Sequence, residues 1–235
     1  LRIAGLAATA VLEKSMRLIA RLTKLEPVRF VSHLDILRLL QRAFRRAGVP
    51  LSYSQGFNPH PLLSFATALS TGYTSGAEWI DVKLDKDMDT DDFLSSVNAA
   101  LPVGFRFKEA YAVEDRLPSL TALLESATYC VTFSADTNAD ELKKDIAALL
   151  SGEIIVEKRT KGGLKNVDIR PQVIEADVAE EAGHAVLTVK GVLNTSGSLN
   201  IELLMGALAR QSGKNYDYSV HRVNVEFIGG RSTPV

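Results

Sequence analysis

Residues 31–61 read VSHLDILRLLQRAFRRAGVPLSYSQGFNPHP and combine a helix start, a basic helix face, a helix stop and two histidines. Ser32 is a typical N-cap, and Asp35, three residues later, completes an approximate capping box. Gly48 stands where a left-handed residue ends a helix, and Pro50 prevents its continuation. The stretch therefore predicts a helix between these signals, followed by an irregular segment that reaches Pro61.

Predicted strands and helices continue on both sides of this stretch. Alternating or β-branched runs predict strands over residues 17–25, 28–32, 62–70, 78–85, 105–113, 128–135, 153–160, 166–178, 184–193 and 220–228. Helical spacing with capping residues predicts helices over 32–47, 90–100, 140–151 and 198–213. The order strand, helix, strand, strand, helix, strand occurs twice, with one extra strand in the second half.

This repeated order predicts an α+β fold of two tandem ferredoxin-like (β-α-β-β-α-β) domains, each an antiparallel sheet with helices on one face. We expect the first domain over residues 16–115 and the second over 126–230. Residues 1–15 hold an apolar run behind a single Arg2, and Met16 follows them. We interpret 1–15 as a leader or an added segment and leave it out of the fold prediction.

Composition excludes several classes of protein. The 235 residues carry a formal net charge of −1, so a uniformly basic nucleic-acid binder is excluded, whereas a local basic patch is not. The single Cys130 allows no internal disulfide and no cysteine-ligated iron–sulfur or zinc site, and indicates a reducing compartment such as the cytoplasm. No stretch reaches the ~20 apolar residues of a membrane span. We predict no cofactor and no membrane partner.

The helix over residues 32–47 presents two faces. Apolar residues at helical spacing should face the sheet, namely Leu34, Leu37, Leu40 and Phe44. A cationic stripe follows the other side, namely Arg38, Arg42, Arg45 and Arg46. From residue 16 to residue 60 eight Lys or Arg residues face two acidic ones, an excess of six. The stripe indicates either a site for phosphate, RNA or a carboxylate-bearing partner, or an ordinary solvated helix face.

The segment SYSQGFNPHP has Gly56 and two prolines to hold side chains in place without regular structure. Its His60 and the earlier His33 allow several roles. They can make structural hydrogen bonds, or bind phosphate or RNA beside the arginines. With Asp35 they are weak metal candidates, although we predict no metal because no ligand spacing supports one. With Asp168 they are weak catalytic candidates for acid–base chemistry.

A second basic region surrounds a glycine turn in EKRTKGGLKNVDIRP. Its cations are Lys158, Arg159, Lys161, Lys165 and Arg170. A two-stranded ribbon of this kind can follow a nucleic-acid backbone, and a solvated hairpin explains the composition equally well. Asp168 is expected to pair with Arg170 or Lys165, or to orient a basic side chain toward a ligand.

Three segments resemble one known family. SHLDILRLLQRAFRRAGVPLSYSQGFNPHP and KGGLKNVDIRP resemble the two motifs of the radical-SAM-linked protein family, a domain of unknown function, and AEWIDVKL matches the strand between them. The resemblance covers residues 16–228. The matching positions are Ser32, His33, Asp35, Arg38, Arg42, Arg45, Arg46, Gln55, Gly56, Phe57, Asn58, Pro59, His60, Pro61, Lys165, Asp168 and Arg170. The segment LLSFATALSTGY departs from the family because it lacks the usual proline.

Members of that family occur beside radical SAM proteins, or fused behind a cobalamin-binding radical SAM domain, often near an E/G-type ribonuclease. The resemblance implies a radical SAM protein as a partner. It implies no radical chemistry here, because the three-cysteine cluster motif is missing.

We therefore expect an accessory protein, without catalysis of its own, that binds RNA or another anionic ligand. The predicted anion- or RNA-binding residues are Arg38, Arg42, Arg45, Arg46, Gln55, Asn58, His60, Lys165 and Arg170. Two alternatives stay open: an RNA-processing or RNA-modifying enzyme that uses His33 or His60, and a protein-interaction module for a radical SAM enzyme. All three share one spatial expectation, that the helix arginines and His60 line a common hollow.

Overall fold

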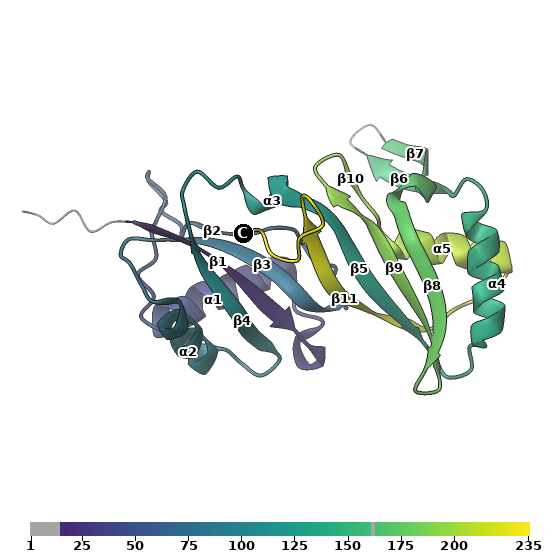
Figure 1. Cartoon of the computed structure of the whole chain (residues 1–235), viewed down its shortest axis with the longest axis horizontal. Helices are drawn as coiled ribbons and strands as arrows, with labels where there is room; N and C mark the ends of the chain where they lie inside the picture. Colours follow the sequence, from purple (N-terminus) through teal and green to yellow (C-terminus); the bar gives the residue numbers. More distant parts are fainter. Residues whose placement is uncertain (1–14, 161–162) are drawn as a thin grey trace, which may run out of the picture.

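The computed structural model describes residues 15–160 and 163–235 as an α+β protein built on one large, mostly antiparallel sheet (Figure 1). The first half contains β1 (Met16–Lys24), α1 (His33–Arg46), β2 (Leu63–Phe65), β3 (Thr74–Leu84), α2 (Thr90–Ala100) and β4 (Phe105–Val113). Its strands lie in the order β4-β1-β3, and β2 pairs with the other side of β3.

The helix signals of the first half are confirmed. Ser32 caps α1 and accepts a hydrogen bond from the Asp35 amide at 3.3 Å, and Gly48 follows the helix at φ +73°. Asp89 caps α2. The strand expected over 28–32 is wrong: Glu26–Val28 form a 3₁₀ turn, because Pro27 suits the first turn of a helix and has no N–H for a sheet.

The second half repeats the order of elements with an inserted hairpin. It contains α3 (Leu120–Leu123), β5 (Leu124–Phe133), α4 (Ala139–Leu150), β6 (Ile155–Thr160), β7 (Gly163–Asp168), β8 (Val173–Glu181), β9 (His184–Asn194), β10 (Gly197–Ser198), α5 (Ile201–Ser212) and β11 (Tyr218–Phe227). The strands lie in the order β11-β5-β9, with β8 and β10 pairing with β9, while β6 and β7 form a separate ribbon. The strand expected over 166–178 is interrupted by a 3₁₀ turn, Arg170–Gln172, which contains Pro171.

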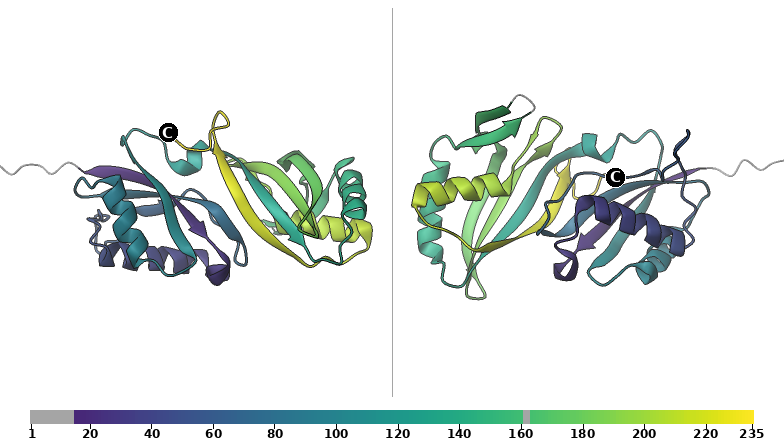
Figure 2. Two further views of the ribbon diagram at one scale, coloured as in Figure 1. Left: turned by 60° about the horizontal axis from the view of Figure 1, so that its bottom comes forward. Right: turned by 180° about the vertical axis from the view of Figure 1, so that it is seen from behind.

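One strand pair joins the halves into a continuous sheet. β11 runs parallel to β3 over two residue pairs, His221 with Thr74 and Arg222 with Ser75. The helices α1 and α2 cover one face of the first half, and α4 and α5 cover the second half (Figure 2). The domain bounds 16–115 and 126–230 stay a prediction, since the sheet passes between the two parts.

Two hydrophobic cores hold these layers together. The first lies between α1, α2 and the sheet, and Leu40, Phe44 and Phe93 are fully buried in it. The second lies under α4 and α5 and extends to the opposite face of β1 and β3, where Trp79 packs against Phe227. Both faces of β1 and β3 are therefore largely buried, and charged residues on these strands, such as Arg17 and Glu78, are held in ion pairs.

The predictions on membrane spans, on Cys130 and on residues 1–15 can now be compared with the structure. No helix within residues 15–160 and 163–235 is long and apolar enough to cross a membrane. Cys130 lies half-buried in β5 with its Sγ 3.8 Å from the Thr188 hydroxyl oxygen. The interpretation of 1–15 as a leader concerns residues that, apart from Ser15, lie outside the described part of the chain.

Candidate anion-binding surface

The outer side of α1 carries the arginines that the sequence singled out, Arg38, Arg42, Arg45 and Arg46, which we name the α1 basic face. The residues that α1 buries are Ile36, Leu40, Ala43 and Phe44. The expectation that Leu34 faces the sheet is wrong, because this side chain is 62% exposed. The helix is rotated slightly from the predicted position, so that Leu34 joins the solvent side with the arginines.

Two of these arginines are held by the protein and two are not. The Arg38 guanidinium contacts Asp35 at 3.1 Å, and Arg46 donates a 2.7 Å hydrogen bond to the Ala100 carbonyl at the end of α2. Arg42 and Arg45 are exposed, and the described residues provide neither with an ion pair or hydrogen bond. Their positive charges are therefore available to a ligand.

Asp35 is the only acidic residue within α1, and its own contacts already neutralise it. A hydrogen bond from the Ser32 hydroxyl at 2.7 Å, followed by the Arg38 guanidinium, lowers the pKa of the Asp35 carboxyl below its usual value. The carboxylate is thus engaged at the N-terminus of the helix, where the helix dipole also favours it. The basic face remains positive toward its C-terminal end.

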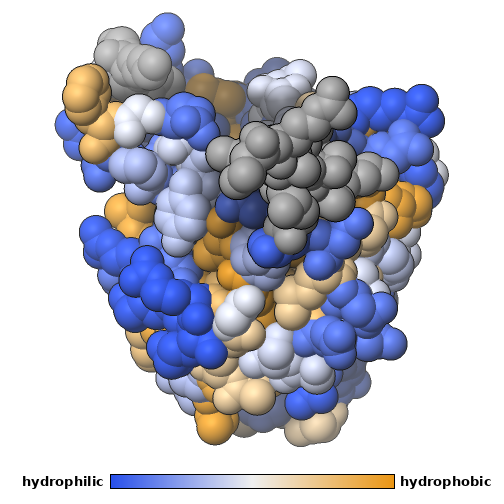
Figure 3. All heavy atoms as spheres, turned by 90° about the vertical axis from the view of Figure 1, so that its left-hand side faces the viewer, coloured by the Kyte–Doolittle hydropathy of each residue, from blue (hydrophilic) through white to orange (hydrophobic). Residues whose placement is uncertain are grey.

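Exposed apolar side chains flank the N-terminal end of the α1 basic face. Phe30 is 69% exposed, and the Arg29 guanidinium carbon lies 4.6 Å from the centroid of its ring. Leu34 lies one helical turn before Arg38. Figure 3 views the molecule from the far, left-hand end of Figure 1, where polar residues are likewise interspersed with small hydrophobic patches. A surface of this kind offers charges for phosphates and a ring face for stacking.

The loop after α1 is closed by its own ends. Tyr53 and Pro61 form a β-bridge, and the Ser54 amide donates to the His60 carbonyl at 2.9 Å. The Ser54 hydroxyl oxygen also accepts from the His60 amide and lies 2.8 Å from His60 Nδ1. Gly56, at φ +126°, makes the turn at the tip. Gln55, Asn58 and Phe57 consequently project into solvent from a well-defined base.

His60 lies on the other side of the sheet from the α1 basic face. It borders a pocket of about 390 Å³ that also contains Arg17, Asp81 and Lys83. These three alternate with the β1 and β3 residues that pack under α1, so they point to the opposite face. The structure therefore does not bring His60 and the helix arginines into one hollow, because strand alternation separates them.

The cations of the His60 pocket are already neutralised. Arg17 forms a 2.6 Å ion pair with Asp81 and also donates to the carbonyls of Asp115 and Pro118. Lys83 contacts Asp115 at 3.0 Å. The pocket is consequently a weaker anion site than the α1 basic face.

The other histidine of the first half has a packing role. His33 is half-buried in the first turn of α1, and its ring meets Phe65 of β2 edge-on at 5.0 Å between centroids. The described residues contain no group of three or more His, Cys, Asp or Glu side chains that could hold a metal ion. The His60 pocket contains neither His33 nor Asp168, so the three weak catalytic candidates do not share it.

The side chains of Asp168 and Arg170 are held by hydrogen bonds to backbone groups at the base of the β6–β7 hairpin. One Asp168 oxygen accepts from the amides of Ile154 and Arg170, at 2.8 and 2.9 Å. The Arg170 side chain donates to the carbonyls of Leu150, at the end of α4, and Val173. The expected ion pair of Asp168 with Arg170 or Lys165 is wrong, because the carboxylate binds backbone N–H groups instead.

The hairpin itself keeps an exposed basic end. Lys158 and Lys165 are directly paired across the two strands, and Arg159 beside them is exposed. Like charges directly opposite each other destabilise a ribbon, so this pair favours a role in binding anions. Lys161 at the turn lies outside the described residues.

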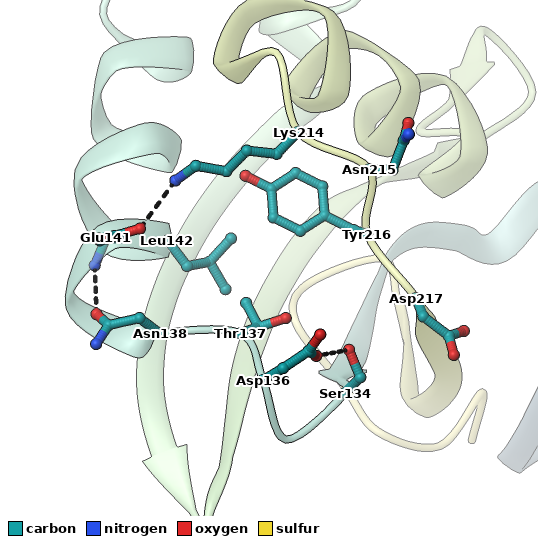
Figure 4. Close-up of a pocket in the computed structure, with 10 residues that line it drawn as sticks. All are labelled: Ser134, Asp136, Thr137, Asn138, Glu141, Leu142, Lys214, Asn215, Tyr216 and Asp217. Atoms are coloured by element: carbon teal, nitrogen blue, oxygen red, sulfur yellow. Dashed lines mark hydrogen bonds and ion pairs between the residues drawn. The ribbon is translucent and has the colours of Figure 1, made fainter.

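A polar pocket in the second half has the opposite character. It measures about 420 Å³ and lies between the N-terminus of α4 and the segment after α5 (Figure 4). Asp136, Glu141 and Asp217 line it, and Lys214 is its one lining cation. Lys214 Nζ donates hydrogen bonds to Asp145 and Glu141, which raise the pKa of Lys214 and neutralise its charge. No pattern in the sequence indicates this pocket, because its walls lie more than 70 residues apart in the chain.

Comparison with known proteins adds the family. Residues 17–213 match the family described as "Uncharacterized protein conserved in bacteria (DUF2344)". The chain belongs to this family. No curated protein matches it. The family description assigns no activity, so function rests on the surfaces described above.

One solved structure shows a similar fold at low sequence identity, and two others align at lower TM-scores. A chain in the "Crystal Structure of a Cbf5-Nop10-Gar1 Complex" aligns with 88% of this protein at 12% identity and a TM-score of 0.50, and this protein spans 48% of that chain. A protein of unknown function from Galdieria sulphuraria aligns with 89% of the chain at 15% identity, covering 99% of its own length, with a TM-score of 0.27. A putative glycine cleavage system transcriptional repressor aligns over 88%, with 98% of its own length, 9% identity and a TM-score of 0.23.

Proposed function

We propose that this protein is a radical-SAM-linked accessory protein that binds RNA through the α1 basic face. The observation that carries the proposal is the exposure of Arg42 and Arg45 without an ion pair or hydrogen bond in the described residues. Arginine suits phosphate because its planar guanidinium forms two parallel hydrogen bonds and stays charged. Both side chains start from an ordered helix, so little backbone entropy is lost when they bind.

The neighbouring surface favours RNA over a small anion. Phe30 at one end of α1 and Phe57 on the loop after it are exposed rings, and unstacked bases of single-stranded RNA stack on such rings. The α1 basic face is open and extended, as a nucleic-acid backbone requires. The β6–β7 hairpin, with Lys158, Arg159 and Lys165, would supply a second contact to a longer RNA.

A filter-binding titration at two salt concentrations tests the proposal. Total cellular RNA should bind the wild type at low salt, and affinity should fall steeply as salt is added because counterions are released. The double variant Arg42→Ala, Arg45→Ala should lose about tenfold or more in affinity, and its salt slope should fall by roughly one for each arginine. No binding of RNA by the wild type at low salt would contradict the proposal.

A matched control is available on α4. Lys143 and Lys144 are exposed cations on a helix of similar length. The double variant Lys143→Ala, Lys144→Ala removes the same charge from a different helix. It should bind RNA almost as well as the wild type, and equal losses in the two double variants would indicate non-specific attraction instead of a site.

The partner rests on resemblance to the radical-SAM-linked family and needs its own test. The tagged protein should co-purify with the radical SAM protein of the same cells after nuclease treatment if the two contact each other directly. Exposed Phe30 and Leu34 favour this interaction module as the second candidate function. Co-purification without any RNA binding would support the module alone.

We also infer that the protein is located in the cytoplasm, since its single cysteine allows no internal disulfide.

We further infer that the two halves are ferredoxin-like units. The strand orders β4-β1-β3-β2 and β11-β5-β9-β8 support this, since each numbers 4-1-3-2 within its own half. The β6–β7 hairpin and the short strand β10 account for the extra strands of the second unit. Separate expression of residues 16–115 with a cooperative unfolding transition would support independent domains, whereas an unfolded fragment would indicate that the shared sheet is required.

A further inference from the structure

A narrow cleft lies where the two halves of the sheet meet. It is bordered by the β2–β3 loop, by Tyr129 of β5 and by the start of α5, and its volume is about 130 Å³. A cleft of this volume has room for a small polar group. Arg222 lines it although this side chain is only 1% exposed.

The buried charges behind the cleft, at Arg222 and its neighbours, do not balance. Arg222 Nε lies 3.0 Å from a Glu78 oxygen, and Nη2 bonds to the same oxygen. Lys24, which is fully buried, donates from Nζ to the Arg29 carbonyl at 2.7 Å. Two buried cations therefore share the single carboxylate of Glu78, which is 4% exposed. A bound anion would compensate the excess.

The pKa values of Arg222 and Lys24 are both shifted by burial and by the neighbouring charges. Burial by itself lowers the pKa of Arg222, but the neighbouring Glu78 and Tyr129 outweigh it and the pKa is raised, so the guanidinium stays charged. Burial lowers the pKa of Lys24, against the pull of Glu78. The bonds to Glu78 use Nε and Nη2 of Arg222, and Tyr129 is a further hydrogen-bond partner of the guanidinium.

We propose that this cleft binds a phosphate group, held by Arg222 and by the hydroxyls of Tyr129, Ser70 and Ser198. Hydroxyl donors from three separate elements suit the several acceptor oxygens of a phosphate better than a planar carboxylate. The N-terminus of α5, capped by Asn200, borders the same space and adds its positive dipole. Nothing in this proposal depends on RNA binding by the α1 basic face.

One carboxylate next to the cleft opposes an anion and is already engaged. Glu202, in the first turn of α5, accepts hydrogen bonds from the hydroxyls of Tyr73 and Tyr218 at 2.9 and 2.8 Å. Tyr73 belongs to the first half and Glu202 to the second, so this bond closes the cleft on one side. A phosphate bound beside it would connect the same two halves.

Isothermal titration of the whole protein with inorganic phosphate, in a phosphate-free buffer, tests the proposal. The wild type should bind one phosphate per chain. The variant Tyr129→Phe, Ser198→Ala keeps the Arg222–Glu78 pair and should still fold, but should bind about tenfold more weakly or not at all. The matched variant Tyr216→Phe, Ser134→Ala in the α4 pocket should bind like the wild type.

Two further ligands distinguish the source of the phosphate. Binding of both inorganic phosphate and adenosine 5′-monophosphate would show that the cleft takes the terminal phosphate of a larger molecule. Binding of inorganic phosphate alone would identify free phosphate as the ligand. Adenosine should not bind in either case, and adenosine binding as tightly as its monophosphate would overturn the assignment.

Two other results would also overturn it. One is the absence of saturable phosphate binding by the folded wild type at millimolar concentrations. The other is binding that survives Tyr129→Phe, Ser198→Ala and disappears in Arg42→Ala, Arg45→Ala, since the phosphate would then occupy the α1 basic face. Neither result affects RNA binding measured by filter titration, so the two proposals fail separately.

Discussion

The arginines of the α1 basic face and the arginine at the junction of the halves use the same side chain in opposite ways. Arg42 and Arg45 stand in solvent with no ion pair or hydrogen bond in the described residues, so they cost the fold little and remain free to bind. Arg222 is buried against Glu78, where the fold depends on its partner. Solvent access decides how strongly the fold depends on an arginine's own ion-pair partner.

The largest expected effect comes from breaking the buried pair. Glu78→Gln leaves Arg222 and Lys24 buried without a carboxylate, and we expect a loss of about 3–5 kcal/mol in the free energy of unfolding. Urea denaturation measures it. Lys24→Met is the control, because it removes the second buried cation and keeps the Arg222–Glu78 ion pair. A loss in Lys24→Met as large as that in Glu78→Gln would show that the charge count does not decide stability here.

A second expected effect concerns Arg170, which the sequence assigned to anion binding. Its guanidinium donates to the carbonyls of Leu150 and Val173, so Arg170→Ala should destabilise the protein by about 1–3 kcal/mol. RNA affinity should stay unchanged, as measured by filter binding. Reduced affinity with unchanged stability would place Arg170 with the exposed arginines instead.

A third prediction concerns the stability of the α1 basic face. Arg42→Ala, Arg45→Ala should change the free energy of unfolding by less than about 0.5 kcal/mol, because neither side chain is buried or paired with any residue that the structure describes. The same variant should lose most RNA affinity in the filter titration. A large loss of stability would mean that these arginines contact parts of the chain beyond the described residues.

The smallest expected effect is a pH dependence at the junction. Burial lowers the pKa of His221 below 6.5, against the attraction of Glu78, and the Thr74 hydroxyl lies 2.8 Å from Nδ1. Since the unfolded state binds the proton more tightly, stability is fully present above pH 6.5 and falls as pH drops through the folded-state pKa. Urea denaturation between about pH 5 and pH 8 should show this slope, and His221→Asn should reduce it.

Local signals predicted the elements well and their interruptions poorly. Ser32, Asp89 and Gly48 define helix ends through short-range hydrogen bonds and backbone angles, which depend on neighbours in sequence. Pro27 and Pro171 turned expected strands into 3₁₀ turns, since a missing N–H matters only once the pairing partner is known. The rotation of α1 that exposes Leu34 depends on packing against the sheet.

Some features of the candidate site could likewise be predicted from the sequence, and others could not. Exposure of the α1 arginines follows from helical spacing, and the sequence predicted it. The separation of His60 from them follows from strand alternation across the sheet, which spacing along the chain does not express. Asp168 and Arg170 look like binding residues in sequence because their backbone partners, such as Leu150, lie elsewhere in the chain.

The sequence by itself determined the α+β class, the caps of α1 and α2, the basic stripe and the family of this protein. These depend on residue identity and on contacts a few positions apart. Only the tertiary structure decided that β11 pairs with β3, that Arg222 meets Glu78 and Lys24, and that a cleft opens beside them. These groups lie up to about 200 residues apart, and their charges interact only because folding removes the water between them.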